Sequence, residues 1–222
     1  MKICACVAKK TKEECINLVK NIDADLIEHR MDYMEKIENL EDIYKNSKLP
    51  IIATNRSLLR GGNFAGDEND RIEYLFRAID SECTMIDLEI GTETSLKKDL
   101  IEYAKSNDCG VIISFHDFEK TPKKNKLIEI MKKERREGAD IGKIVTTANS
   151  MEECHLILEM LLYAKKYEFP LIAFSMGEKG RFTRIAACSY GAPFIYASVD
   201  ERTGPGQISV EEMRRIWEVL FP

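Results

Sequence analysis

The feature that most constrains the fold of this chain is an alternation of short apolar segments with amphipathic segments. The apolar segments have the length of β-strands, and most are rich in Ile, Val, Phe or Thr. Their repetition with intervening helices favours a (β/α)8 barrel, a fold of the α/β class. The eight apolar segments are residues 2–7, 25–30, 50–56, 84–90, 110–116, 140–145, 170–176 and 193–199.

The stretches between these segments have helical periodicity. Leu127, Ile128 and Met131 recur at the three- and four-residue spacing of one helix face. Thr94, Ser150 and Ser209 are residue types that begin helices, and each precedes an amphipathic run. A doubly wound open sheet is the alternative, but it requires a glycine-rich turn after the first strand, where this chain reads VAKKTKE. Because nothing resembles a linker, we expect one catalytic domain over residues 1–222.

Composition narrows the classes of partner. The chain has 33 basic and 38 acidic residues, interspersed, for a net charge of −5, which disfavours nucleic acid. The apolar stretches all fall well short of the ~20 residues of a membrane span, and the N-terminus leads directly into a strand rather than a signal peptide. The seven cysteines are scattered and form no CxxC pair. We therefore expect reduced thiols in a cytoplasmic protein, with neither a disulfide framework nor a zinc site.

Charged residues gather at the carboxyl ends of several predicted strands, where barrel enzymes hold their chemistry. Residues two apart on a strand share a face. A buried charge costs several kcal/mol unless it is paired, so these residues either form structural pairs, for instance Glu28 with Arg56, or build a site. Same-face placement is expected for Glu28 with Arg30, Thr54 with Arg56, Asp87 with Glu89, and Ser114 with His116.

Lys143 and His116 suggest a specific chemistry. Lys143 lies in the apolar segment IGKIV, and His116 ends the preceding strand. A neutral lysine amine attacks a carbonyl to form an imine, and the protonated imine acidifies the neighbouring C–H. A histidine is the natural base for that proton and can return it to a leaving hydroxyl. We expect His29 to face away from the barrel interior and His155 to lie on the surface or to pack, so neither is a candidate.

The chain resembles the type I 3-dehydroquinate dehydratase family. The motifs that carry this resemblance keep their order over nearly the whole chain. Each motif alone is weak, and the combination is specific. They are EHR (28–30), TNR (54–56), ISFHDF (113–118), KIV (143–145), MGEKGRFTR (176–184) and TGPGQIS (203–209).

The resemblance implies a (β/α)8 barrel, usually a homodimer, that converts 3-dehydroquinate to 3-dehydroshikimate and water in the shikimate pathway of aromatic amino-acid biosynthesis. It implies syn elimination through a lysine Schiff base, without metal or organic cofactor. Lys143 then forms the imine and His116 is the general acid and base. The implied substrate-binding residues are Glu28, Arg30, Arg56, Arg184, Thr203 and Gln207. Arg184 matches the clamp on the substrate carboxylate, a role that suits a planar guanidinium.

One position departs from the family. Many relatives carry a glutamate before a Gly-Gly pair, and this chain has Arg60 there, in RSLLRGGNF. That glutamate is thought to assist the histidine, so we expect Asp87 or Glu89 on the fourth strand to take over. The glycine-rich loop SLLRGGNFAGDEND (57–70) follows the third strand, and we interpret it as a mobile lid.

Two other functions compete with this interpretation. A class I aldolase also needs a strand lysine, although many aldolases act on sugar phosphates and need a late phosphate-binding loop. A barrel without catalytic activity that binds a small acid is the second alternative. It has no need of the pair of Lys143 and His116, and that pair therefore favours an enzyme.

Overall fold

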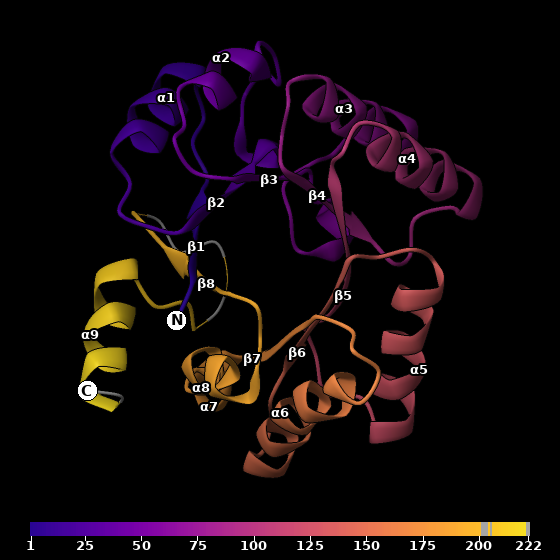
Figure 1. Ribbon diagram of the computed structural model, residues 1–222, viewed down its shortest axis with the longest axis vertical. Helices are drawn as coiled ribbons and strands as arrows, with labels where there is room; N and C mark the ends of the chain where they lie inside the picture. The colour runs from indigo at the N-terminus through magenta and orange to yellow at the C-terminus, as the bar shows by residue number, and fades with distance from the viewer. Residues whose placement is uncertain (201–203, 205, 221–222) are drawn as a thin grey trace. The chain divides into compact units, whose positions relative to one another are not determined.

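A computed structural model of the chain describes residues 1–200, 204 and 206–220. Strands and helices alternate along the chain, as the ribbon in Figure 1 shows. The chain divides into two compact units. We call Ala5–Ile112 the N-terminal unit, and Met1–Cys4 with Ile113–Pro222 the C-terminal unit.

The N-terminal unit contains the strands that carry the predicted acidic and basic residues. Strands β2 and β3 pair in parallel, as do β3 and β4. The register aligns Arg30 with Thr54, and Thr54 with Asp87, so the predicted polar positions meet at one level of the sheet. The elements are β1 (Ile3–Val7, which enters this unit at Ala5), α1 (Lys12–Asn21), β2 (Leu26–Arg30), η1 (Met31–Tyr33), α2 (Leu40–Lys45), β3 (Ile51–Thr54), η2 (Leu58–Arg60), α3 (Glu68–Asp80), β4 (Met85–Glu89) and α4 (Thr94–Ser106).

The C-terminal unit holds β6 and β7 in a parallel pair, with β5 as the other neighbour of β6. The register of β6 and β7 aligns Lys143 with Ile172 and Val145 with Phe174. The elements are β5 (Gly110–Asp117, which enters this unit at Ile113), α5 (Lys124–Arg136), β6 (Ile141–Thr147), α6 (Met151–Lys165), β7 (Leu171–Met176), α7 (Gly177–Gly180), α8 (Thr183–Tyr190), β8 (Ile195–Ser198) and α9 (Val210–Leu220).

Each of the eight predicted strand segments contains a strand. Ser150 caps α6 by accepting the backbone N–H of Glu153 at 3.3 Å, and Ser209 accepts that of Glu212 at 3.1 Å before α9, both as predicted. The prediction at Thr94 is wrong by one residue. Glu93 precedes α4, and its carboxylate bonds the hydroxyl of Ser95 rather than capping the helix.

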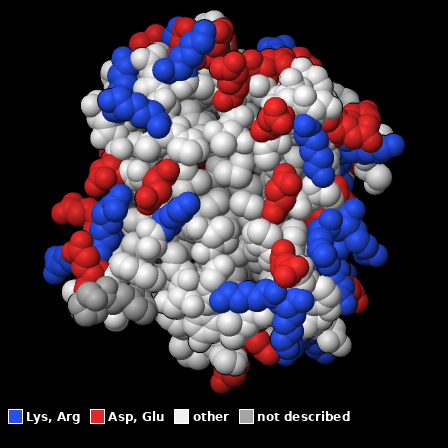
Figure 2. Space-filling model, in the orientation of Figure 1, with Lys and Arg blue, Asp and Glu red and all other residues white. Residues whose placement is uncertain are grey.

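The surface drawn in Figure 2 shows basic and acidic side chains interspersed, as the composition predicts. Within residues 1–200, 204 and 206–220, no helix is both long enough and apolar enough to cross a membrane. All seven cysteines are free thiols.

His29 lies in the helix-facing layer of the N-terminal unit. Its side chain is 0% exposed. Nε2 lies 3.6 Å from Sγ of Cys15 on α1, and Nδ1 lies 3.3 Å from Oη of Tyr44 on α2. The prediction that His29 faces away from the strands' inner side is therefore confirmed. Burial lowers the pKa of His29 to about 4, because the charged imidazolium loses its hydration.

His29 makes folding stability dependent on pH. The unfolded chain binds a proton at His29 near pH ~6.5, and the folded protein only near pH 4, so stability is lost as the pH falls through this window. Full protonation costs the folded state about 3 kcal/mol. Urea denaturation between about pH 7 and about pH 4 tests this. His29→Gln should flatten the dependence, and a variant of the exposed His155 should retain it.

Candidate active site

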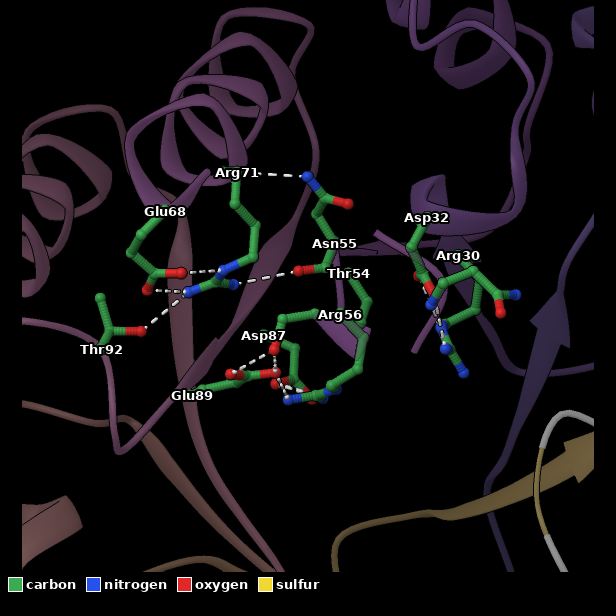
Figure 3. Close-up of polar contacts among 12 residues, drawn as sticks. Arg30, Asp32, Thr54, Asn55, Arg56, Glu68, Arg71, Asp87, Glu89 and Thr92 are labelled. Carbon is green, nitrogen blue, oxygen red and sulfur yellow. Dashed lines mark hydrogen bonds and ion pairs between the residues drawn. The ribbon is translucent and has the colours of Figure 1, made fainter. Parts of the chain in front are cut away.

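Arg30 and Asp32 form a buried ion pair at the end of β2, drawn at the right of Figure 3. Nε and Nη2 of Arg30 donate to Oδ1 and Oδ2 of Asp32 at 2.9 and 2.7 Å. Burial disfavours the charge of Arg30, but Asp32 outweighs it and raises the arginine's pKa above its ordinary value. Asp32 also accepts the backbone N–H of Asn63 at 3.0 Å. The carboxylate therefore joins Arg30 to the loop after β3.

Glu28 accepts two hydrogen bonds from neighbouring strands. The hydroxyl of Thr54 donates to Oε1 at 3.0 Å, and the thiol of Cys6 on β1 donates to Oε2 at 3.2 Å. All three side chains are buried. These bonds hold the carboxylate of Glu28 in one orientation. Glu28 is thus held by two neutral donors, and its negative charge also helps to raise the pKa of Arg56.

Arg56 engages both acids of β4 (Figure 3). Its Nη2 lies 2.8 Å from Oδ1 of Asp87, and its Nη1 lies 3.4 Å from Oε1 of Glu89. Burial disfavours the guanidinium charge, and the two carboxylates more than compensate, so the pKa of Arg56 is raised. The hydroxyl of Ser57 also donates to Glu89 at 3.3 Å. The expected roles of Asp87 and Glu89 toward His116 remain predictions.

Arg71 on α3 fixes the backbone beside Arg56, as the upper part of Figure 3 shows. Its side chain is 1% exposed. Nη1 donates to the carbonyl of Asn55 at 3.0 Å, and Nη2 donates to the hydroxyl of Thr92 at 2.8 Å. The amide of Asn55 donates back to the carbonyl of Arg71 at 3.2 Å, and Glu68 pairs with both Nε and Nη2. The end of β3 is therefore held from the helix side.

Replacement of Arg71 by methionine should destabilise the protein by about 3 kcal/mol, because buried acceptors at Asn55 and Thr92 lose their donor. It should also raise KM, since the backbone that orients Arg56 is released. Urea denaturation and steady-state kinetics measure the two effects. Arg77→Met on the same helix is the matched control. Arg77 pairs with Glu73 on the surface, so its loss should cost less than about 0.5 kcal/mol.

The loop after β3 folds back onto Arg56. The backbone N–H of Phe64 donates to the carbonyl of Arg56 at 3.1 Å, and that of Gly62 donates to the carbonyl of Ser57 at 2.9 Å. A Cβ at Gly62 would lie 2.1 Å from the carbonyl oxygen of Arg56, so this close approach requires glycine. Arg60 sits on η2, with Nη2 3.0 Å from where a Cβ of Gly91 would be. That this loop acts as a mobile lid remains a prediction.

Lys143 lies on β6 in the C-terminal unit and is 4% exposed. Its Nζ is 4.0 Å from the centroid of the Tyr196 ring on β8. The position of Lys143 inside an apolar strand is what buries its amine. A buried amine on an inward-facing strand position is suited to attack a small carbonyl compound.

Arg184 is placed by the turn that follows β7. Thr183 accepts the backbone N–H of Ser175 at 2.8 Å and donates to the carbonyl of Gly180 at 2.6 Å, which ties the start of α8 to β7. Arg184 is 4% exposed, with Cζ 4.4 Å from the Phe174 centroid. Arg181 is exposed. This difference in burial agrees with the choice of Arg184 over Arg181.

His116 lies near the end of β5, the strand that neighbours β6 and Lys143. It is half-buried, and its ring stacks on that of Phe118, with centroids 6.1 Å apart and planes 13° apart. Asp117 accepts the backbone N–H groups of Glu119 and Lys120, both at 3.0 Å. Asp117 therefore shapes the turn after the strand.

The loop after β8 lies against Arg184 and the β7 turn. A Cβ at Gly204 would lie 4.0 Å from Nη2 of Arg184, and one at Gly206 would lie 2.8 Å from the carbonyl oxygen of Gly177. Gln207 is 4% exposed and lines a groove of about 350 Å³ with Arg181 and residues of α9. Thr203, the remaining residue predicted in this loop, lies outside the described residues.

The two units offer different chemistry. At the strand ends of the N-terminal unit there are four buried carboxyl groups and two buried guanidinium groups. Such a set of hydrogen-bond acceptors and donors is suited to bind the hydroxyl groups of a ligand. These groups belong to Glu28, Asp32, Asp87, Glu89, Arg30 and Arg56. The C-terminal unit contributes the buried amine of Lys143, which is suited to a carbonyl, and the buried guanidinium of Arg184, which is suited to a carboxylate. Within the described residues, no cluster of three or more His, Cys, Asp or Glu side chains is arranged to hold a metal ion.

Comparison with known proteins decides the family. The sequence model of the type I 3-dehydroquinase family matches residues 3–222. This chain belongs to the type I 3-dehydroquinase family. The 3-dehydroquinate dehydratase of Desulfotalea psychrophila is 36% identical to it over 219 residues, which cover 97% of this chain and 96% of that protein.

Solved structures of the family share the fold. The 3-dehydroquinate dehydratase of Geobacillus kaustophilus aligns with a TM-score of 0.91 and 26% identity, covering 99% of this chain and 90% of that one. The type I 3-dehydroquinate dehydratase of Clostridium difficile, solved with covalently modified comenic acid, aligns with a TM-score of 0.88 and 25% identity, covering 99% and 91%. The predictions of a (β/α)8 barrel and of membership in the type I family are confirmed.

Proposed function

We propose that this member of the family converts 3-dehydroquinate to 3-dehydroshikimate and water, through an imine on Lys143. The observation that carries the proposal is the buried amine of Lys143 on β6, in a chain matched by the family model from residue 3 to residue 222. This reaction makes the protein a hydro-lyase of the shikimate pathway. No metal or organic cofactor enters the proposed reaction.

The elimination follows from the ketone of the substrate. Nζ of Lys143 attacks the ketone carbon, and the ketone oxygen leaves as water. The protonated imine draws electrons from the adjacent C–H, and His116 removes that proton. The resulting enamine expels the hydroxyl group one carbon further on, and His116 returns the proton to it. Water then hydrolyses the product imine and frees Lys143.

The other roles are assigned residue by residue. Arg184 binds the substrate carboxylate, because a guanidinium donates two parallel hydrogen bonds to it. Glu28 and Arg30 bind hydroxyl groups and order the site, and Arg56 also binds the substrate. Their fixed hydrogen-bond partners support these roles. Thr203 and Gln207 are assigned to substrate binding. Asp87 and Glu89 support the histidine in place of the family glutamate.

The first test of the activity is an ultraviolet assay for the conjugated ketone that elimination creates. Purified protein should form this chromophore from 3-dehydroquinate, and should retain the activity after treatment with a chelator. A panel of sugar phosphates with aldol chemistry serves as the comparison. Cleavage of a sugar phosphate without dehydratase turnover would instead establish the aldolase alternative.

The pattern of exposed apolar residues supports a homodimer, which we propose as the assembly. Phe182, Ile216 and Leu220 line an apolar groove of about 570 Å³ between α8 and α9. Val219 on α9 is 76% exposed. Sedimentation velocity should give a dimer, and Val219→Glu should shift it toward monomer. A wild-type monomer at micromolar concentration would contradict this assembly.

We also propose that residues 1–222 form a single catalytic domain. We further propose a cytoplasmic location, because a reducing compartment suits a protein with seven free thiols.

A further inference from the structure

In the C-terminal unit, each of the two basic groups that the proposed reaction uses lies over the face of an aromatic ring. Nζ of Lys143 lies over Tyr196, and the guanidinium of Arg184 lies over Phe174, at 4.0 and 4.4 Å from the ring centroids. The two rings pack against each other at 6.4 Å, tilted by 50°. All four side chains are 4% exposed. The cations and rings therefore meet where water is largely excluded.

The face of an aromatic ring carries partial negative charge and attracts a cation, most strongly where both are desolvated. A lysine side chain also has four rotatable bonds, so an isolated amine samples many positions. Nζ of Lys143 lies 4.0 Å from the centroid of the Tyr196 ring, a contact that favours this position over the others. Because Nζ must attack the substrate carbonyl from the place where it is later regenerated, its position governs how often it meets that carbonyl productively.

We propose that Tyr196 is a positioning residue for the imine nitrogen, and that Phe174 is a positioning residue for the guanidinium that binds the substrate carboxylate. This inference rests on the proposed function. When the Nζ–C bond has formed and the ketone oxygen has left as water, the protonated imine carries a positive charge on that nitrogen. When His116 takes the neighbouring proton, the C–H electron pair forms the enamine and neutralises that charge. Expulsion of the hydroxyl group restores it, so the ring faces a cation at both imine stages.

The two rings should affect different kinetic constants. Tyr196→Leu should lower kcat and the rate at which borohydride traps the imine, each by about tenfold. Phe174→Leu should raise KM by about tenfold and leave the trapping rate at saturating substrate within about threefold, because it loosens Arg184 rather than Lys143. A role in core packing alone would lower stability without this division between kcat and KM.

Two variants separate the ring from its surroundings. Tyr196→Phe keeps the aromatic face and should recover most of the trapping rate lost in Tyr196→Leu. Phe194→Leu is the matched control, since Phe194 is also 4% exposed and packs edge-to-face on Tyr196 at 5.6 Å. It removes an equal ring from the same cluster, while the cations lie over the other two rings. We expect a lower melting temperature with kcat and KM within about threefold.

The outcomes distinguish this inference from the proposed function. Absence of a trapped adduct in the wild-type protein would refute the imine itself. A wild-type adduct with equal trapping by Tyr196→Leu would overturn the role of Tyr196 alone. If Tyr196→Leu does not fold, phenylalanines with increasing numbers of ring fluorines at position 196 keep the shape and weaken the ring's negative face. Trapping rates that fall with each fluorine support the inference, and constant rates overturn it.

Discussion

Replacement of Lys143 by alanine should reduce dehydratase turnover by at least about 10⁴-fold, the order expected when an enzyme loses its covalent nucleophile. The buried strand position leaves no other amine to take its place on β6. Binding of 3-dehydroquinate, measured by isothermal titration calorimetry, should persist, because Arg184 still binds the carboxylate. Lys143→Arg should be equally inactive, since it retains a positive charge and cannot form an imine.

Lys97 provides a matched control for the loss of a buried lysine. It is 3% exposed on α4, and its Nζ donates to the carbonyl of Ile90 at 2.8 Å. Lys97→Ala should lower the melting temperature and keep kcat within severalfold. If Lys143→Ala retained turnover, the imine mechanism would be wrong. Loss of turnover in both variants with equal loss of folding would assign Lys143 a structural role.

Replacement of His116 by asparagine should lower kcat by about 10²- to 10⁴-fold, the usual contribution of a general acid and base. The imine should still form, because Lys143 supplies the nucleophile and His116 acts in the later proton transfers. Trapping with borohydride in this variant should therefore give an adduct despite slow turnover. The two variants then separate bond formation from proton transfer.

The other two histidines are controls of opposite kinds. His155→Gln, at an exposed position of α6, should leave kcat unchanged. His29→Gln, in the helix-facing layer, should change the pH dependence of stability while keeping kcat within severalfold. A kcat of His116→Asn within tenfold of the wild type would show that another group moves the proton.

The periodicity of the sequence was sufficient to predict the strands and the long helices, because both follow from local hydrophobic spacing. It did not single out α2, α7 and α8, which are too short for a helical repeat to be recognised. The helix start at Thr94 was also misplaced, because the choice among Glu93, Thr94 and Ser95 depends on side-chain contacts. Local spacing does not encode those contacts.

Prediction of the site succeeded where one residue type implies one chemistry, as for Lys143 in an apolar strand. It failed for residues that act through others. Asp32 pairs with Arg30, but it lies on η1 beyond the end of β2, where the rule that residues two apart on a strand share a face does not apply. Arg71 and Tyr196 gave no local signal either. Their contacts join elements 16 and 53 residues apart in the chain, which only the fold brings together.

The measurement that tests the central claim most directly is the intact mass of the protein after incubation with 3-dehydroquinate and borohydride. The imine mechanism predicts one ligand-sized adduct, which peptide mapping places on Lys143 and which Lys143→Ala lacks. Clean dehydratase activity with no adduct would contradict the role of Lys143. An adduct on another lysine would move the site elsewhere, and neither adduct nor activity would favour the aldolase or a binding protein.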